Sequence, residues 1–282
     1  MSEPTISFIV SVHNCVELTR KMIQTLFDTV NLENHEVILI DDASTDETPD
    51  FLVSISHRCR VLRNAENLGF SKSNNRAAQA ATGDLLLFLN NDLELVPGWL
   101  EPMLNLNRPH LKVGAVGNIQ RNYATGLVDH AGIFFDLNGM PTHAWKNRKR
   151  LPPHKWSERT AITGACFLIR RSLFNSLDGF SEDYRNGMED VDLCARIKEQ
   201  GYRLLVSHES VIRHHISRSP GRHDHNDQNS NLFKERWSQT MRSYGSKEWP
   251  SQYFHRYARY WWRMDPKLAL KALWMLLRFR SA

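Results

Sequence analysis

The feature that most constrains the fold is the alternation of short apolar runs with amphipathic segments over the first 120 residues. The apolar runs have the length of strands, and the segments between them have the length and periodicity of helices. We expect strands at 6–12, 36–42, 60–65, 84–90 and 113–118, and helices at 15–30, 71–81 and 97–106. Because parallel strands need long crossover connections, usually helical, this order predicts an α/β fold with a mainly parallel mixed sheet flanked by helices.

The pattern loosens after residue 118. A hairpin-like piece and a basic loop are followed by a buried strand (161–171), a helix that Gly201 closes, and a strand with a turn (202–215). A further helix is expected over 228–245. We therefore predict one domain over 1–245, with parts at about 1–118 and 119–245, and a C-terminal helical tail over 246–282.

Composition excludes several classes of protein. Of the 282 residues, 41% are hydrophobic and 24% are charged, which is ordinary for a globular protein and argues against collagen-like, coiled-coil and disordered chains. The four cysteines are widely separated, the N-terminus lacks the pattern of a signal peptide, and no uncharged apolar stretch is about 18 residues long. We expect a cytoplasmic protein.

The chain has a net charge of +5, and its excess of positive charge is concentrated in two segments. The segment 251–282 carries seven Lys and Arg residues against one acid, and a loop at 143–159 carries +5. The tail is also rich in aromatic residues, and 267–280 is amphipathic. This combination is typical of a helix that lies on an anionic membrane surface, although such a helix can equally pack on the main domain or on a second subunit. We expect no nucleic-acid partner.

Polar side chains follow three of the expected strands, and ligands of parallel α/β sheets bind beyond the carboxyl ends of strands. Asp42 follows the second strand, where a carboxylate can accept a hydrogen bond from a base or a ribose, or can simply cap a helix. Asp92 ends the motif Asn90-Asn91-Asp92, which suits a hard divalent cation, although an Asx-stabilised turn is the alternative. One acid holds a metal poorly, so a further ligand must come from elsewhere.

Two later motifs complete the candidate site. Glu189-Asp190-Val191-Asp192 places three acids at the start of a helix, which is more than capping requires, and Asp190 would suit a general base. His214, in the motif Arg213-His214-His215, could complete a cation site with Asp92, although a lone histidine is usually structural.

Together these features resemble the family 2 glycosyltransferases of the GT-A fold, especially the bacterial branch with rhamnosyl- and galactofuranosyl-type enzymes. The resemblance runs from about residue 5 to residue 219. The matching segments are ISFIVSVHN, VILIDDASTDET, NLGFSKSNNRAAQAATGDLLLFLNNDLELVPGWL, GACFLIRRSLFNSLDGFSEDY, MEDVDLCARIKEQGYRLL and VIRHHISRS.

The resemblance implies an inverting transfer of a sugar from a nucleotide-sugar donor, with Mg²⁺ or Mn²⁺ as cofactor. It implies a nucleotide-binding part at about 1–118 and an acceptor-side part at about 119–245. The residue roles that it implies are nucleoside contacts by Ser11 and Asp42, donor binding by Gly69 and Asn74, metal and diphosphate binding by Asn91 and Asp92, acid–base chemistry by Glu189 and Asp190, and metal binding by His214, with His215 as a rival.

One position departs from the family pattern. Many relatives have Asp-x-Asp where this chain has Asn90-Asn91-Asp92, and the smaller negative charge predicts weaker metal binding. The expected acceptor is a glycan or a lipid-linked glycan in cell-surface polysaccharide biosynthesis. A non-catalytic binding partner of a glycan assembly complex is the alternative, and a nucleotidyltransferase or a dinucleotide-binding enzyme is disfavoured because no suitable Gly-rich loop follows a strand.

Overall fold

The structure is a computed structural model that describes residues 4–216, 225–258 and 260–280, with only the backbone for 279 and 280. Residues 217–219 of the matching text and Arg259 of the basic tail therefore lie outside the described residues. The strands are β1 (Ile6–Val12), β2 (Glu36–Asp41), β3 (Arg60–Arg63), β4 (Leu85–Asn90), β5 (Leu93–Glu94), β6 (Val113–Asn122), β7 (Val128–His130), β8 (Ile133–Phe135), β9 (Pro141–His143), β10 (Trp156–Arg159), β11 (Cys166–Arg170) and β12 (Arg203–His214). The α-helices are α1 (Val16–Thr29), α2 (Thr48–Ser54), α3 (Gly69–Gln79), α4 (Glu101–Leu106), α5 (Arg171–Ser176), α6 (Glu189–Glu199), α7 (Asn226–Tyr257) and α8 (Pro266–Arg280).

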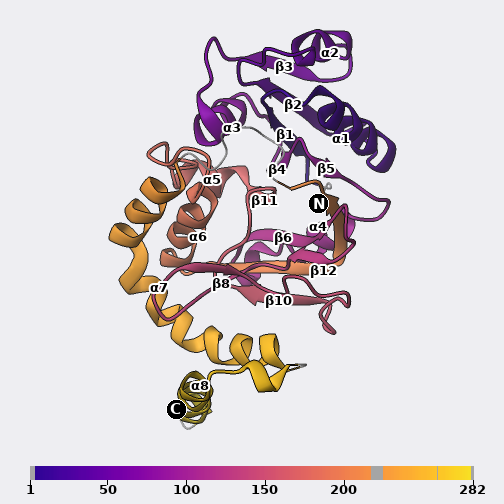
Figure 1. Ribbon diagram of the computed structural model, residues 1–282. Helices are drawn as coiled ribbons and strands as arrows, with labels where there is room; N and C mark the ends of the chain where they lie inside the picture. Colours follow the sequence, from indigo (N-terminus) through magenta and orange to yellow (C-terminus); the bar gives the residue numbers. More distant parts are fainter. Residues whose placement is uncertain (1–3, 217–224, 259, 281–282) are drawn as a thin grey trace.

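One large sheet runs through the molecule in the order β10-β12-β6-β11-β4-β1-β2-β3 (Figure 1). The four strands β4, β1, β2 and β3 are parallel, as are β6 and β12, whereas β11 is antiparallel to both of its neighbours. The prediction of a mainly parallel mixed α/β sheet with flanking helices and a C-terminal helical extension is confirmed.

The parallel half of the sheet follows from its sequence. Strands β1 and β4 are buried on both faces, as near-continuous apolar runs predict for strands between two helical layers. Their neighbouring positions pair in register, so that Ser11 at the end of β1 lies beside Asn90 at the end of β4. This pairing brings the polar residues after the two strands to the same edge of the sheet.

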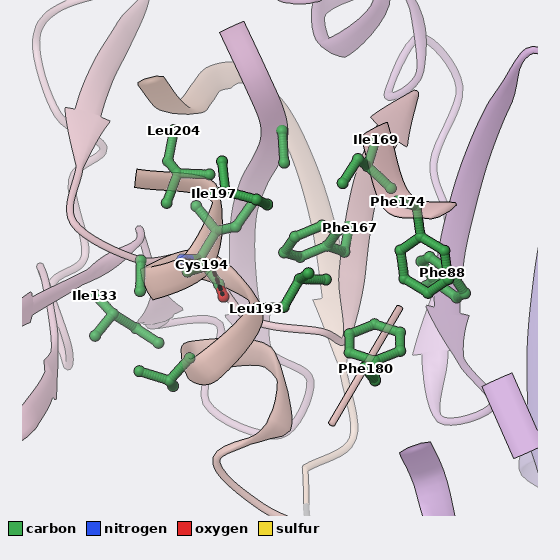
Figure 2. Close-up of a cluster of buried hydrophobic side chains, with 14 of the residues drawn as sticks. Phe88, Ile133, Phe167, Ile169, Phe174, Phe180, Leu193, Cys194, Ile197 and Leu204 are labelled. Atoms are coloured by element: carbon green, nitrogen blue, oxygen red, sulfur yellow. Dashed lines mark hydrogen bonds between the residues drawn. The ribbon is translucent and has the colours of Figure 1, made fainter. Parts of the chain in front are cut away.

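The core on one face of the sheet is built around aromatic side chains. Phe88 of β4 packs against Phe180 with ring centroids 4.9 Å apart, and Phe174 of α5 lies 5.0 Å from the Phe88 ring (Figure 2). Leu193 and Ile197 of α6 belong to the same cluster. Because α6 is anchored by this packing, the acids of its first turn have a fixed position relative to the sheet.

The second half of the chain differs from expectation in two details. The segment expected to be a strand and a turn (202–215) is one long strand, β12, with an irregularity between Ser207 and Val211. The helix expected over 228–245 continues to Tyr257 as part of α7, so the boundary that we predict at 245 falls inside a helix. In Figure 1, α7 runs along one side of the molecule and leads to α8 at the end opposite α2 and β3.

Candidate active site

An acid–imidazole pair lies beyond the end of β4. Asp92 lies two residues after the end of β4. The short strand β5 then pairs antiparallel with the end of β12, so that Leu93 lies opposite His214. This pairing brings His214 Nε2 to 3.0 Å from Asp92 Oδ1, across 122 positions of sequence. Asp92 is 6% exposed and His214 is 5% exposed, so the interaction is shielded from bulk water.

The pair offers one carboxylate and one imidazole to a cation. Within the described part of the chain, no cluster of three or more His, Cys, Asp or Glu side chains is arranged to hold a metal ion. Two protein ligands nevertheless fit Mg²⁺ or Mn²⁺ at a phosphate site, because such ions keep several waters and bind phosphate oxygens of the substrate. His214 Nδ1 is buried and makes no hydrogen bond to any described residue.

Asn91 and His215, which are adjacent in sequence to Asp92 and His214, make contacts with other residues. Asn91 donates a hydrogen bond from Nδ2 to the hydroxyl of Thr19 in α1, at 3.0 Å. His215 stacks on the ring of Tyr123 with centroids 4.0 Å apart, and its Nε2 lies 3.9 Å from Glu94. Between the two candidate histidines, His214 is therefore the one whose ring meets Asp92.

Asp190 lies at the start of α6 beside a backbone loop that leads into β11. Its Oδ2 accepts a hydrogen bond from the backbone N–H of Gly164 at 2.7 Å, and its Oδ1 accepts one from Val191. A Cβ atom at Gly164 would lie 3.2 Å from the Cβ of Asp190, so the close approach requires a small residue there. Asp190 is partly exposed, as a residue that takes a proton from a substrate must be.

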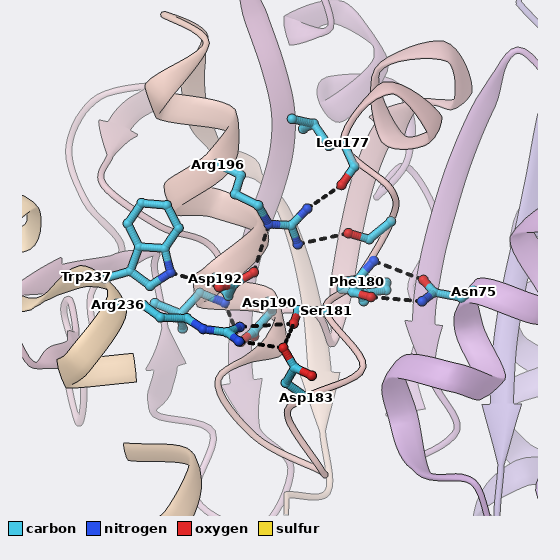
Figure 3. A network of polar contacts seen from close by, with 12 residues as sticks. Asn75, Leu177, Phe180, Ser181, Asp183, Asp190, Asp192, Arg196, Arg236 and Trp237 are labelled. Carbon is cyan, nitrogen blue, oxygen red and sulfur yellow. Dashed lines mark hydrogen bonds and ion pairs between the residues drawn. The ribbon is translucent and has the colours of Figure 1, made fainter. Parts of the chain in front are cut away.

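The other acids of the motif have structural partners. Glu189 is buried and accepts a hydrogen bond from the backbone N–H of Gly187, which shapes the turn before α6. Asp192 binds Arg196 through one oxygen and accepts a hydrogen bond from the indole of Trp237 through the other, each at 2.8 Å (Figure 3). Asp192 therefore joins α6 to α7, and Asp190 is the acid of this motif that remains best placed for chemistry.

Asp42 holds the start of α3. Its Oδ2 accepts a hydrogen bond from the backbone N–H of Gly69 and its Oδ1 one from that of Leu68, both at 2.8 Å. Asn64 donates to the same Oδ1 at 2.7 Å. Asp42, at the end of the neighbouring strand, thus caps the N-terminus of α3. Its negative charge also interacts favourably with the positive end of the helix dipole. The predicted contact of Asp42 with a nucleoside stays a prediction.

Ser11 and Asn74 meet directly. Asn74, which is buried in α3, donates from Nδ2 to the hydroxyl of Ser11 at 3.0 Å and to the carbonyl of Phe70. Our sequence reasoning missed Asn64, which bridges Asp42 and the hydroxyl of Ser73. Asn64 follows β3, so the rule that drew attention to polar residues after the other strands would have found it.

Two contacts connect these groups into one site. The backbone N–H of Asn90 donates to the carbonyl of Ala165 at 3.0 Å, so the loop that holds Asp190 borders the end of β4 and Asp92. On the other side, the backbone N–H of Phe70, next to Gly69, donates to Asn186 in the turn before α6, also at 3.0 Å. The predicted residues thus lie along one edge of the sheet, although their roles stay predictions.

Comparison with known proteins identifies the family of this chain. The profile described as Glycosyl transferase family 2 matches residues 7–178, which is more than half of the chain. The chain is 33% identical over 227 residues to the O-antigen biosynthesis protein RfbC of Myxococcus xanthus, an alignment that covers 77% of this chain and 18% of that protein. It spans 27% of a second relative, protein y4gI of Sinorhizobium fredii.

A relative of more similar length is the N-acetylglucosaminyl-diphospho-decaprenol L-rhamnosyltransferase of Mycobacterium tuberculosis. It is 29% identical over 209 residues, with 66% of this chain and 68% of that protein covered.

Two solved structures share the fold. The mannosyltransferase PcManGT from Pyrobaculum calidifontis in complex with GDP-Man and Mn²⁺ has a TM-score of 0.61 and 19% identity, with 99% of this chain and 81% of that chain covered. GalNAc-T7 with UDP, GalNAc and Mn²⁺ has a TM-score of 0.62 and 18% identity, with 75% and 44% covered. The chain belongs to glycosyl transferase family 2 and has the GT-A fold of the glycosyltransferases, as its sequence predicts.

Proposed function

We propose that the protein transfers a sugar from a nucleoside-diphosphate sugar to a hydroxyl group of a glycan or lipid-linked acceptor, with inversion at the anomeric carbon. The observation that carries this proposal is that the loop bound to Asp190 borders the end of β4, just beyond which the Asp92–His214 pair lies. Relatives named for O-antigen biosynthesis and for rhamnosyl transfer to a lipid-linked acceptor support a role in cell-surface polysaccharide assembly.

The chemical step needs one base and no enzyme nucleophile. The acceptor hydroxyl gives its proton to a carboxylate oxygen of Asp190, and the hydroxyl oxygen attacks the anomeric carbon on the face opposite the diphosphate. The new C–O bond forms as the bond to the diphosphate oxygen breaks, and the electron pair of that bond leaves with the nucleoside diphosphate. The hydrogen bond from Gly164 orients the Asp190 carboxylate for this proton transfer.

The leaving diphosphate requires neutralisation of its charge. A divalent cation bound there supplies Lewis-acid stabilisation of the developing negative charge. Asp92 and His214 would hold Mg²⁺ or Mn²⁺, and the partly exposed ends of β1 and β4 would receive the donor, with Ser11 and Asn74 on the nucleoside side. Gly69, next to Asp42, borders the same region.

Replacement of the base tests the proposal. In Asp190→Asn the carboxylate can no longer take a proton, so we expect kcat for transfer to fall by roughly 10²- to 10⁴-fold. The assay uses UDP-, GDP- and dTDP-sugars with p-nitrophenyl glycosides as acceptors and Mn²⁺ present, and it measures both the product and the released nucleoside diphosphate. Transfer by Asp190→Asn at the rate of the unaltered protein would refute the assignment.

The matched control is Asp183→Asn, which removes an acid from the segment between α5 and α6. Asp183 is exposed and pairs with Arg236, outside the proposed site. We expect this variant to keep its activity, and thermal shift with the nucleoside diphosphate should show that both variants bind nucleotide. A wild-type chain that binds nucleotide sugars but releases no nucleoside diphosphate would instead support the non-catalytic binding role.

We also propose that α8 places the enzyme on an anionic membrane surface at the cytoplasmic face. α8 packs on α7, and Ala272 and Met275 on one side of α8 are buried. The other side presents a second apolar stripe to solvent, in which Leu270 is 69%, Trp274 59% and Leu277 60% exposed. An exposed stripe of this kind is typical of an interaction surface.

The basic residues of α8 favour anionic lipid as the partner of this surface. Lys267, Lys271 and Arg278 follow one another at helical spacings of four and seven residues, so they form a basic row beside the apolar stripe. Trp261 and Trp262 are exposed in the turn before α8. Basic side chains with exposed tryptophans around apolar residues favour the headgroup region of anionic lipid. Within the described residues no helix is long and apolar enough to span a membrane, so the proposed contact is peripheral.

A further inference from the structure

The basic loop (143–159) presents cationic side chains that the reaction described above does not use. Lys149 and Arg150 are exposed, and neither forms an ion pair within the part of the chain that the structure describes. The side chain of Lys146 is 54% exposed, and its Nζ lies 3.7 Å from the carboxylate of Asp129. Exposed cations that outnumber the acids beside them favour an anionic partner.

Two arginines hold the backbone of this loop in place. The guanidinium of Arg148 donates to the carbonyl of His255 and, at 3.2 Å, to that of Arg256, both in the last turn of α7. The guanidinium of Arg121 in β6 donates to the carbonyl of Lys149, also at 3.2 Å. Because the loop is fixed on both sides, its exposed side chains start from an ordered backbone, which lowers the entropy that binding must cost.

On one side, the loop is connected to the C-terminal tail. The ring of Trp145 lies 4.2 Å from that of His255 in α7. The hydroxyl of Tyr253, in the same part of α7, accepts a hydrogen bond at 3.0 Å from the backbone N–H of Asp265, directly before α8. The basic loop therefore borders the end of α7 from which the proposed membrane-contacting helix follows.

On the other side, strand pairing connects the loop to the candidate active site. Arg213, next to His214, lies beside Arg121 of β6. Arg121 lies opposite Val128 of β7, and Val128 in turn forms a backbone bridge with Arg148 of the loop. Neighbouring strands are about 4.8 Å apart, so these three steps place the loop roughly 15 Å from the strand that carries His214. The loop thus lies at the same edge of the sheet as the candidate metal pair.

We propose that the basic loop binds the diphosphate group that joins the sugar of a lipid-linked acceptor to its lipid, with Lys149 and Arg150 as the principal contacts. Such an acceptor has its lipid in the membrane beside α8 and its reacting sugar at Asp190, so its diphosphate lies between the two. The loop occupies this intermediate position, and Lys and Arg donate charge-assisted hydrogen bonds to phosphate oxygens. The inference rests on the proposed function, because it names the class of acceptor.

Neutralisation of the two exposed cations tests the inference. The acceptors are the decyl diphosphate ester of a sugar and the p-nitrophenyl glycoside of the same sugar, each with donor and Mn²⁺ and without vesicles. Hydrogen bonds to charged groups are stronger than neutral ones, so we expect the wild type to favour the diphosphate ester by at least about tenfold in kcat/KM. Lys149→Gln/Arg150→Gln should lose this preference and keep kcat/KM for the p-nitrophenyl glycoside.

The matched control is Lys234→Gln/Arg242→Gln, which removes one lysine and one arginine from exposed positions of α7 and should keep the preference. Equal use of both acceptors by the wild type would overturn the inference, as would an unchanged preference in Lys149→Gln/Arg150→Gln. If that variant keeps the preference but binds phosphatidylglycerol vesicles more weakly, the loop contacts lipid headgroups instead. A wild-type chain that uses neither acceptor and releases no nucleoside diphosphate would overturn the proposed function itself.

Discussion

At the scale of single residues, the metal binding that we propose depends on the contact between Asp92 and His214. Only one acid of Asn90-Asn91-Asp92 can bind a cation, and the amide of Asn91 is engaged with Thr19. In the proposed site, the imidazole of His214 would therefore contribute a large share of the affinity for a metal. The low charge of the pair also predicts that the metal is bound mainly together with the diphosphate of the donor.

Metal removal tests this view. We expect EDTA to abolish transfer and added Mn²⁺ or Mg²⁺ to restore it. His214→Ala should raise the Mn²⁺ concentration for half-maximal activity by about tenfold or more. His215→Ala is the matched control, because the ring of His215 stacks on Tyr123 and should leave the metal response unchanged. Full activity after chelation would exclude a role of the cation. A larger effect of His215→Ala than of His214→Ala on the metal response would show that His215, and not His214, is the metal ligand.

At the scale of elements, the fold depends on how α7 packs on the turn between β8 and β9. A Cβ atom at Gly245 of α7 would lie 2.5 Å from the backbone carbonyl oxygen of Asp136, so only glycine allows this approach. From the other side, a Cβ at Gly139 would lie 2.7 Å from the carbonyl oxygen of Ser238 in α7. Two glycines thus let a helix and a turn approach backbone to backbone.

Substitution of Gly245 by alanine measures how much this contact contributes to the stability of the fold. Alanine favours the helix by about 1 kcal/mol, but the clash with a backbone carbonyl costs more, typically 1–3 kcal/mol or above. We expect Gly245→Ala to lower the melting temperature by a few degrees, measured by circular dichroism. Ser243→Ala, at an exposed position of the same helix, should be close to neutral. A more stable Gly245→Ala variant would show that α7 does not lie against the turn.

At the scale of the whole molecule, α8 lies at the end opposite α2 and β3 (Figure 1). Binding to a membrane through α8 would therefore leave the N-terminal part, where we propose that the donor binds, away from the lipid. Substitution of Leu270, Trp274 and Leu277 by glutamate places negative charge on the exposed stripe without touching the buried side of α8. Truncation at 245 would be less informative, because it cuts α7 beside the main body.

Co-sedimentation with vesicles is the measurement. We expect the full chain to bind vesicles that contain phosphatidylglycerol, to bind phosphatidylcholine vesicles weakly, and to lose affinity as salt increases. The triple glutamate variant should bind at least about tenfold more weakly. Val53→Glu changes an exposed apolar residue of α2 and should bind as the wild type does. If the wild-type chain instead binds no vesicles but forms dimers that the triple variant does not form, the exposed stripe is the interface with a second subunit.

The local part of this architecture could be read from the sequence. The apolar runs predicted β1 with its observed bounds and the other parallel strands to within two residues at most ends, because period and turn chemistry are local properties of the chain. The polar residues after β1, β2 and β4 were expected at one edge of the sheet, and the pairing of these strands brings them there. The motifs and their order along the chain are properties of the sequence, and they were sufficient to identify the family.

Only the tertiary structure decided which of these residues meet. The pairing of β5 with β12 selects His214 over its neighbour, and Asp42 is engaged with the start of α3, which spacing alone could not show. The contact between His130 and His143 depends on β9 folding back onto β8, and the part of α7 beyond 245 contacts the basic loop, where the ring of His255 lies 4.2 Å from that of Trp145. Such contacts join residues far apart in the chain, so the sequence by itself determined the elements and the chemistry available, and the packing of those elements determined the site.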